Sequence, residues 1–272
     1  MIIVKYISDF EYGFSKCFGN TLMKNYDDVL KEYCLTILKP ECLLTEKALE
    51  ALKIYSEYGY HPIYIKIKTL SQEQIFSLWK YGWIQPTILR VLMNCITMGW
   101  NNCAIVILKS DSKVKDACEF LNSKKGHSII NPNNKNTIRA RLKSLNIFLN
   151  YIHISDNTDD FIREIPILLD YNEIVELISV IKSGVLLSKD NVFKNLQPYI
   201  KNYVIESPTK LFREYIDMLQ NKINVSHELK EELESAYKNK KITYELFIKL
   251  LSSNAIEWNW ETIIVFSQFI DY

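Results

Sequence analysis

Three short segments of this 272-residue chain carry side chains suited to moving a phosphoryl group. They read LKPE at 38–41, TIRAR at 137–141 and NYIHISD at 150–156. The last segment contains His153, and a neutral imidazole is a good nucleophile for phosphorus near neutral pH. The other two contain lysine and arginine, whose positive charges suit oxygens over which negative charge spreads during transfer. Each segment alone means little, so their joint occurrence is the informative observation.

Strand and helix patterns alternate around these segments. Short apolar runs rich in β-formers predict strands at 33–39, 62–70, 103–109 and 145–154. Helical spacing and capping residues predict helices at 45–58, after Ser71, at 87–98 and at 112–121. The Gly, Pro and Asn content of 126–136 is typical of an irregular loop. This interleaving predicts an α/β or α+β sandwich, in which helices cover one sheet.

The second half of the chain has helical periodicity almost throughout. Apolar residues recur at helical spacing after Tyr171, and Pro208 follows Ser207 as a first helical residue does. We therefore predict a leader at 1–32, an α and β domain at 33–170 and a helical C-terminal domain or extension at 171–272. A helical extension packed onto the first domain would show the same pattern.

Composition limits the partners and the compartment. Lys and Arg total 33 against 32 Asp and Glu, so the near-neutral balance predicts no nucleic-acid partner. The six cysteines form no CxxC pair, which favours free thiols in a reducing compartment. No secretory signal pattern and no apolar run of about 18 residues is present, so we expect a cytoplasmic protein without a membrane partner.

Together the three segments resemble the nucleoside diphosphate kinase family. That family ends its first strand in a Lys-Pro-Asp turn, carries Thr-Ile-Arg after an irregular loop, and places its phosphorylated histidine in Asn-x-x-His-Gly-Ser-Asp. All three patterns occur here in the same order. The resemblance covers about half of the chain. It implies an α+β fold, a ferredoxin-like βαββαβ sandwich, followed by the all-α C-terminal region.

The resemblance also implies roles for particular residues. His153 matches the phosphorylated nucleophile, and Glu164, eleven residues later, matches the carboxylate that fixes the other ring nitrogen. Mg²⁺ is expected to arrive with ATP or another nucleoside triphosphate, with no metal held directly by the protein. The expected nucleotide and phosphate contacts are Lys39, Arg139, Asn150, Ser155 and, in place of an arginine, Lys124; the candidates for stacking on the base are Trp79, Tyr81 and Trp83.

Several positions depart from the family pattern. Glu41 replaces the aspartate of the turn, Ala140-Arg141 replaces Gly-Asp, and Ile130 replaces a threonine that contacts phosphate. Ile154 stands where the family has glycine after the histidine. We expect this branched side chain either to narrow the approach of the γ-phosphate to His153 or to reshape the backbone that a glycine would allow.

Three functions are compatible with these residues. The leading hypothesis is a phosphotransferase that moves the γ-phosphate of a nucleoside triphosphate through a phosphohistidine to a nucleoside diphosphate, in a homo-oligomer. The second keeps the phosphohistidine but passes the phosphoryl group to a specialised acceptor. The third is a non-catalytic nucleotide sensor with the helical half as its effector. Base specificity and the role of 171–272 are not indicated by any motif.

Overall fold

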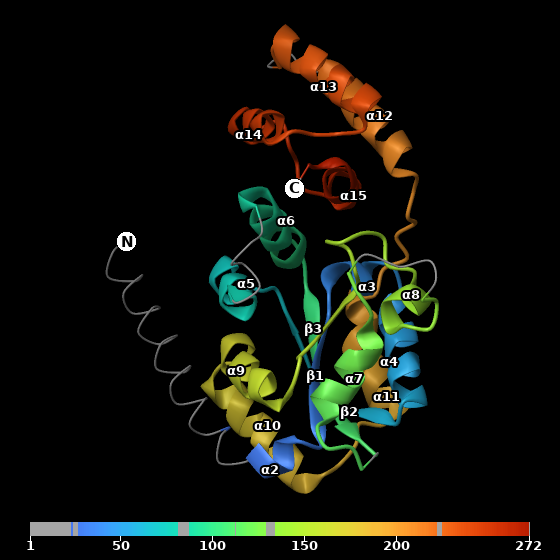
Figure 1. The fold of residues 1–272 in the computed structure, drawn as a ribbon, viewed down its shortest axis with the longest axis vertical. Coiled ribbons are helices and arrows are strands. Elements are labelled where there is room, and N and C mark those ends of the chain that lie inside the picture. The colour runs from blue at the N-terminus through green and yellow to red at the C-terminus, as the bar shows by residue number, and fades with distance from the viewer. Residues whose placement is uncertain are drawn as a thin grey trace, which may run out of the picture.

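The computed structural model describes residues 23, 27–80, 87–111, 113–128, 134–221 and 225–271. After a short helix α2 (Asp27–Leu30), helices surround a central sheet, and a separate group of helices lies beyond one end of it (Figure 1). No helix in the described ranges has the length and apolar character needed to cross a membrane.

The sheet has four antiparallel strands in the order β2-β3-β1-β4. The strands are β1 (Tyr33–Leu38), β2 (Tyr60–Lys68), β3 (Cys103–Ser110) and β4 (Ile152–Ile154). Every residue of β1 is buried, as expected of an apolar run in the centre of a sheet. With helices between β1 and β2 and between β3 and β4, this order is the ferredoxin-like βαββαβ plan, and the predicted α+β class is confirmed.

Both faces of the sheet are covered. On one face lie α4 (Lys47–Glu57) and α7 (Ala117–Lys125), where the Tyr60 hydroxyl donates to the Ala117 carbonyl at 2.7 Å. On the other lie α9 (Thr158–Leu168) and α10 (Tyr171–Ser183), where the Tyr33 hydroxyl donates to the Ile181 carbonyl at 3.4 Å. Because side chains alternate along a strand, neighbouring residues of β1 and β4 point to different helix layers.

Helices α5 (Gln72–Leu78) and α6 (Ile88–Gly99) are inserted between β2 and β3. Ser71 accepts the Gln74 amide hydrogen and forms a capping box, and Thr87 accepts the Arg90 amide hydrogen. Both predicted helix starts are confirmed. The helix predicted at 112–121 instead begins at Ala117, because the Asp116 side chain caps it.

The predicted strand at 145–154 is mostly wrong. Only Ile152–Ile154 pairs with β1, since Asn146 draws the preceding backbone into a turn by accepting the amide hydrogens of Phe148 and Leu149, each at 2.9 Å. Helices α2, α3, α8 and α9 were also not predicted from the sequence pattern. Helix α3 (Pro40–Leu44) has proline in its first turn, α8 (Ile138–Leu142) is capped by Thr137, and α9 is capped by Asn157.

The C-terminal half is helical, as predicted. After α11 (Lys189–Leu196) and a 3₁₀ turn, η2 (Gln197–Tyr199), the remaining helices are α12 (Pro208–Gln220), α13 (His227–Asn239), α14 (Tyr244–Ser252) and α15 (Trp260–Phe269). Figure 1 shows α12 to α15 grouped beside α6. Pro208 begins α12 and Ser226 caps α13 through the Leu229 amide, so both predicted starts are confirmed.

Two hydrophobic cores hold these elements. The larger one joins the sheet to α10 and α11 through Ile174, Leu177 and Leu196. The second joins α12 to α15 with Leu89 and Met93 of α6. Helices α10 and α11 therefore pack with the sheet although they follow Asp170. The division at 33–170 and 171–272 stays a prediction, because packing within one chain does not tell which parts fold independently.

Candidate active site

His153 lies in β4 with a carboxylate against one ring nitrogen. It pairs with Ile37 of β1, and its Nε2 is 3.2 and 3.1 Å from Oε1 and Oε2 of Glu164 in α9. An ionised carboxylate only accepts hydrogen bonds, so in the neutral imidazole Nε2 carries the hydrogen and Nδ1 carries the lone pair. Among the described residues no group is hydrogen-bonded to Nδ1. The His153 side chain is 12% exposed.

Glu164 is buried and has several donors. Its side chain is 3% exposed, and the fully buried Ser155 donates its hydroxyl to Oε2 at 2.5 Å. Arg163 donates from Nη2 to Oε1 at 3.1 Å. A buried carboxylate requires such partners. The predicted residues His153, Ser155 and Glu164 thus meet, while Arg163 was missed because nothing but its place beside Glu164 marks it in the sequence.

Trp79 forms a wall of this site. It follows α5, and its ring stands edge-on to the imidazole of His153, with centroids 5.6 Å apart and an interplanar angle of 82°. The other two candidates for base stacking, Tyr81 and Trp83, lie outside the described residues. Trp79 therefore contacts the candidate nucleophile itself.

Ile154 does not face the imidazole. It is fully buried and pairs with Thr36, whose hydroxyl lies 2.9 Å from that of Tyr55 in α4. Its side chain therefore belongs to the α4 layer, opposite the α9 layer that holds Glu164. The expectation that Ile154 narrows the approach to His153 is wrong for this geometry. Ile130 lies outside the described residues.

Three other predicted residues meet at the amide oxygen of Asn150. The Lys39 ammonium donates to it at 3.1 Å, and Arg139 Nη2 does so at 3.3 Å. Lys39 also donates to the Phe148 carbonyl and lies 3.5 Å from Oε1 of Glu41. The fork of Arg139 further binds the carbonyls of Ile152 at 2.9 Å and Gly126 at 3.1 Å.

Lys39 and Arg139 are buried, and burial disfavours the charged form of each side chain. Burial lowers the pKa of Lys39, an effect that Glu41 opposes and Arg139 reinforces. Burial likewise lowers the pKa of Arg139, to about 10. The buried Nε of Arg139 has no hydrogen-bond partner among the described residues. A cluster with more cations than carboxylates is suited to an anionic group.

Lys125 is the lysine of α7 whose side chain reaches β4. The Lys124 ammonium lies 4.9 Å from the centre of the Phe120 ring, whereas Lys125 donates to the Ile154 carbonyl at 3.3 Å and lies 3.5 Å from Asp156. Burial, followed by the charge of Arg139, lowers the pKa of Lys125. Adjacent helical residues point about 100° apart, so an offset of one position changes what the side chain reaches.

Glu41 and Lys39 also hold the backbone that leads into β4. Tyr151 has φ of 66°, and the Ile152 amide donates to the Asn150 carbonyl at 2.8 Å, which makes a strained γ-turn. Glu41 Oε1 accepts the Tyr151 amide hydrogen at 2.8 Å, and the Lys39 amide donates to the Tyr151 carbonyl at 2.9 Å. The Lys-Pro-Glu turn therefore positions the strand that carries His153.

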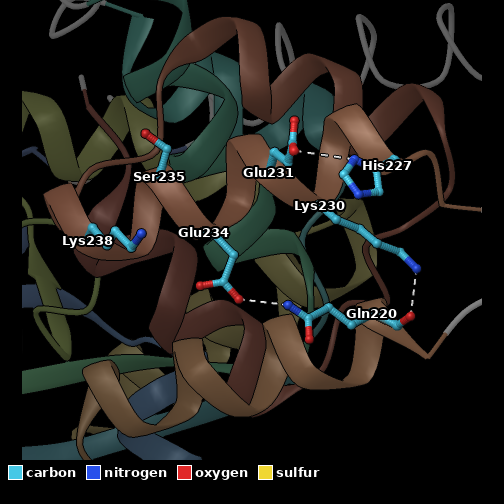
Figure 2. Close-up of a pocket in the computed structure, with 7 residues that line it drawn as sticks. All are labelled: Gln220, His227, Lys230, Glu231, Glu234, Ser235 and Lys238. Carbon is cyan, nitrogen blue, oxygen red and sulfur yellow. Dashed lines mark hydrogen bonds and ion pairs between the residues drawn. The ribbon is translucent and has the colours of Figure 1, made fainter.

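A pocket also lies on the C-terminal helices. A cavity of about 570 Å³ opens between α12 and α13 (Figure 2). Its side chains pair with one another on the surface: Gln220 donates to Glu234 at 2.7 Å, and His227 lies 3.4 Å from Glu231. We interpret it as a solvated helix face, because the paired His227 is 86% exposed. The described part of the chain contains no group of three or more His, Cys, Asp or Glu that could hold a metal ion.

The structure is similar to two solved nucleoside diphosphate kinases. The enzyme from Aquifex aeolicus is 20% identical, with 52% of this chain and 97% of that chain covered and a TM-score of 0.44. The NDP kinase from Pyrobaculum aerophilum is 18% identical, with 53% and 98% covered and a TM-score of 0.38. At these identities and TM-scores the likeness carries no conclusion about activity, and the ferredoxin-like plan rests on the strand order of this chain's own sheet. No protein-family model and no curated protein sequence matches the chain.

Proposed function

We propose that this chain is a nucleotide phosphotransferase in which His153 carries the phosphoryl group. The observation that carries the proposal is the contact of Nε2 with Glu164, because it leaves Nδ1 as the nitrogen with the lone pair. Ser155 supports the same carboxylate. A nucleophile, a group that orients it and a support for that group form a recurring catalytic arrangement.

The proposed reaction has two displacements. Nδ1 of His153 attacks the γ-phosphorus of a nucleoside triphosphate, a P–N bond forms, and the P–O bond to the leaving nucleoside diphosphate breaks. Glu164 stabilises the positive charge that develops on the ring, through the Nε2 hydrogen. In the second displacement a terminal phosphate oxygen of the acceptor attacks the phosphorus, the P–N bond breaks, and neutral His153 is restored.

Nucleotide contacts are proposed for the cluster around Asn150. Lys39, Arg139 and Lys125 supply positive charge beside β4, and Asn150 supplies an amide. Mg²⁺ would enter with the nucleotide, bound mainly through phosphate oxygens as this cation prefers.

The test is formation of a phosphoenzyme. Incubation with ATP labelled at the γ-phosphate should give a protein-bound label that is stable in alkali and lost in acid, as a phosphoramidate is. His153→Asn should remove the label, and Glu164→Gln should slow its appearance by roughly 10²-fold, the usual scale for loss of acid–base support. A folded wild-type protein that takes up no label would refute the proposal.

The molecule that accepts the phosphoryl group from His153 is a separate proposal. We propose a nucleoside diphosphate first, and isolated phosphoenzyme should lose its label to such an acceptor faster than to water. Transfer only to another small molecule would support the specialised-acceptor alternative. A panel of nucleoside diphosphates, monophosphates and non-nucleotide phosphates separates the two outcomes.

A non-catalytic nucleotide sensor is the second candidate. Lys39 and Arg139 already donate to protein oxygens, so a nucleotide must compete with these bonds. A sensor should bind nucleotide in calorimetry, form no phosphoenzyme, and bind equally well after His153→Ala. A catalyst should lose turnover in the same variant.

The compartment and the assembly are also proposals. The described cysteines are free, and Cys34, Cys42, Cys103 and Cys118 are buried, which is compatible with the cytoplasm that we propose. We further propose a homo-oligomer, which light scattering after size-exclusion chromatography would test.

A further inference from the structure

Arg163 connects two elements that form the walls around His153. From α9 it donates to the carbonyls of Ser77 and Leu78 at the end of α5, each at 3.2 Å. It also donates to Glu164 Oε1 at 3.1 Å and to Asp160 at 3.0 Å. The carbonyls at a helix end carry partial negative charge, so a guanidinium is well placed there. One side chain thus holds both the carboxylate behind His153 and the helix end that precedes Trp79.

The buried carboxylate of Glu164 requires a positive partner. Two residues of the described chain lie within ion-pair distance of it, His153 at 3.1 Å and Arg163 at 3.1 Å. If His153 supplied the charge, both ring nitrogens would carry hydrogen, and no lone pair would remain for attack on phosphorus. Arginine is charged at any physiological pH, so Arg163 can supply it permanently.

In the described part of the chain, the other charged groups of α7, α8 and α9 near the imidazole have partners of their own. Asp160 of α9 pairs with Arg163, and Lys125 of α7 bonds to the Ile154 carbonyl and pairs with Asp156, which follows β4. Arg139 of α8 bonds to carbonyls and to Asn150. Within the described residues, Arg163 is therefore the cation other than the imidazole that is bonded directly to Glu164.

We propose that Arg163 is a positioning residue that balances the charge of Glu164, so that His153 stays neutral with its lone pair on Nδ1. The same side chain keeps the end of α5, and with it Trp79, beside the ring. The catalytic consequence rests on the proposed phosphotransferase function, whereas the charge state of His153 is a property of the protein without substrate.

Nitrogen NMR of histidine tests the charge assignment directly. The protein is labelled with ¹⁵N-histidine, and the His153 signals are assigned by comparison with His153→Asn. The wild-type ring should be neutral at about pH 7.5, with hydrogen on Nε2. Arg163→Met should convert a larger fraction of the ring to imidazolium at the same pH, and Arg163→Lys should restore the wild-type spectrum. Asp160→Asn is the matched control, since it removes the other carboxylate partner of Arg163 and should leave the ring neutral.

Two results would overturn the proposal: a wild-type ring that is already imidazolium, or an Arg163→Met ring that matches the wild type. If Arg163→Met does not fold, as circular dichroism would show, Arg163→Gln replaces it as the neutral variant. The lost bonds to α5 alone would lower stability without changing the protonation of the ring. The spectrum therefore separates charge balance from structural support.

Phosphoenzyme formation tests the catalytic consequence. Arg163→Met should slow labelling of His153 by about tenfold near neutral pH, and the deficit should shrink as the pH is raised, because the neutral ring is then regained. A deficit that stays constant with pH would overturn the charge role. If the wild type itself takes up no label, the proposed function fails, and the spectra still decide the role of Arg163.

Discussion

The side chain of Glu41 accepts the backbone amide hydrogen of Tyr151 at 2.8 Å and thereby holds the left-handed residue two positions before His153. The same oxygen lies 3.5 Å from the buried Lys39 ammonium. One carboxylate therefore supports both a strained backbone and a buried cation. The position of His153 therefore depends on Glu41, which lies in α3 directly after β1.

Removing Glu41 should therefore be costly. We expect Glu41→Ala to lower the free energy of unfolding by about 3–5 kcal/mol, since it leaves a buried ammonium without its countercharge. Glu41→Gln keeps an acceptor for the Tyr151 amide and should cost less. Urea unfolding followed by circular dichroism measures both. A loss below about 1 kcal/mol in Glu41→Ala would show that the contact with Lys39 contributes little.

Much of the fold could be predicted because its signals are local. The apolar run at β1, the cap at Ser71 and the proline at Pro208 each act on the backbone within a few residues. Contacts between segments that are distant in the sequence leave no such local signal. Asn146 bends a segment whose composition favours a strand, and the packing of α10 against the sheet is invisible in its helical spacing.

The candidate site was predictable to the same extent. The order of motifs led to His153, Ser155 and Glu164, which the structure brings together. The rotation of α7 decides whether Lys124 or Lys125 reaches the site, and sequence counting does not resolve it. Arg163 and the bonds of Glu41 arise from contacts between distant segments, and no spacing rule marks them.

Introducing glycine at position 154 should not increase activity. Because the Ile154 side chain lies in the core on the α4 face, Ile154→Gly should destabilise the protein by roughly 3–5 kcal/mol through cavity formation and lost strand propensity. The rate of His153 labelling should not increase. Thermal unfolding and phosphoenzyme assays on Ile154→Gly and the milder Ile154→Val check this. Faster labelling in the glycine variant would mean that Ile154 does obstruct the site.

A buried hydroxyl in the second core offers a test of packing. Tyr215 is buried, and its hydroxyl has no hydrogen-bond partner among the described residues. Tyr215→Phe should therefore leave stability unchanged or raise it by up to about 1 kcal/mol. Tyr60→Phe is the matched control, because that hydroxyl donates to the Ala117 carbonyl, and its loss should cost about 1 kcal/mol. Equal losses in both variants would indicate a hidden partner for Tyr215.

The docking of α10 on β2 should weaken in acid. Glu173 lies between Lys66, at 3.0 Å, and Lys68. Burial raises the pKa of Glu173, but hydrogen bonds from Lys68, the Asp170 amide and Lys66 outweigh it, so the pKa lies below its ordinary value of 4.5. When folding lowers the pKa of a carboxyl group, its ionised form contributes its full stabilisation at pH values above the unfolded-state pKa. This contribution is lost as the pH falls through the folded-state pKa.

Glu173→Gln isolates this contribution, because glutamine keeps the shape and loses the charge. The wild type should be more stable than Glu173→Gln above about pH 5, and the difference should shrink as the pH falls below the ordinary carboxyl pKa of 4.5. Urea unfolding at a series of pH values measures the difference. High salt should reduce it only in part, since the carboxylate is mostly buried. A difference that is independent of pH would show that the ion pairs of Glu173 do not hold α10 against β2.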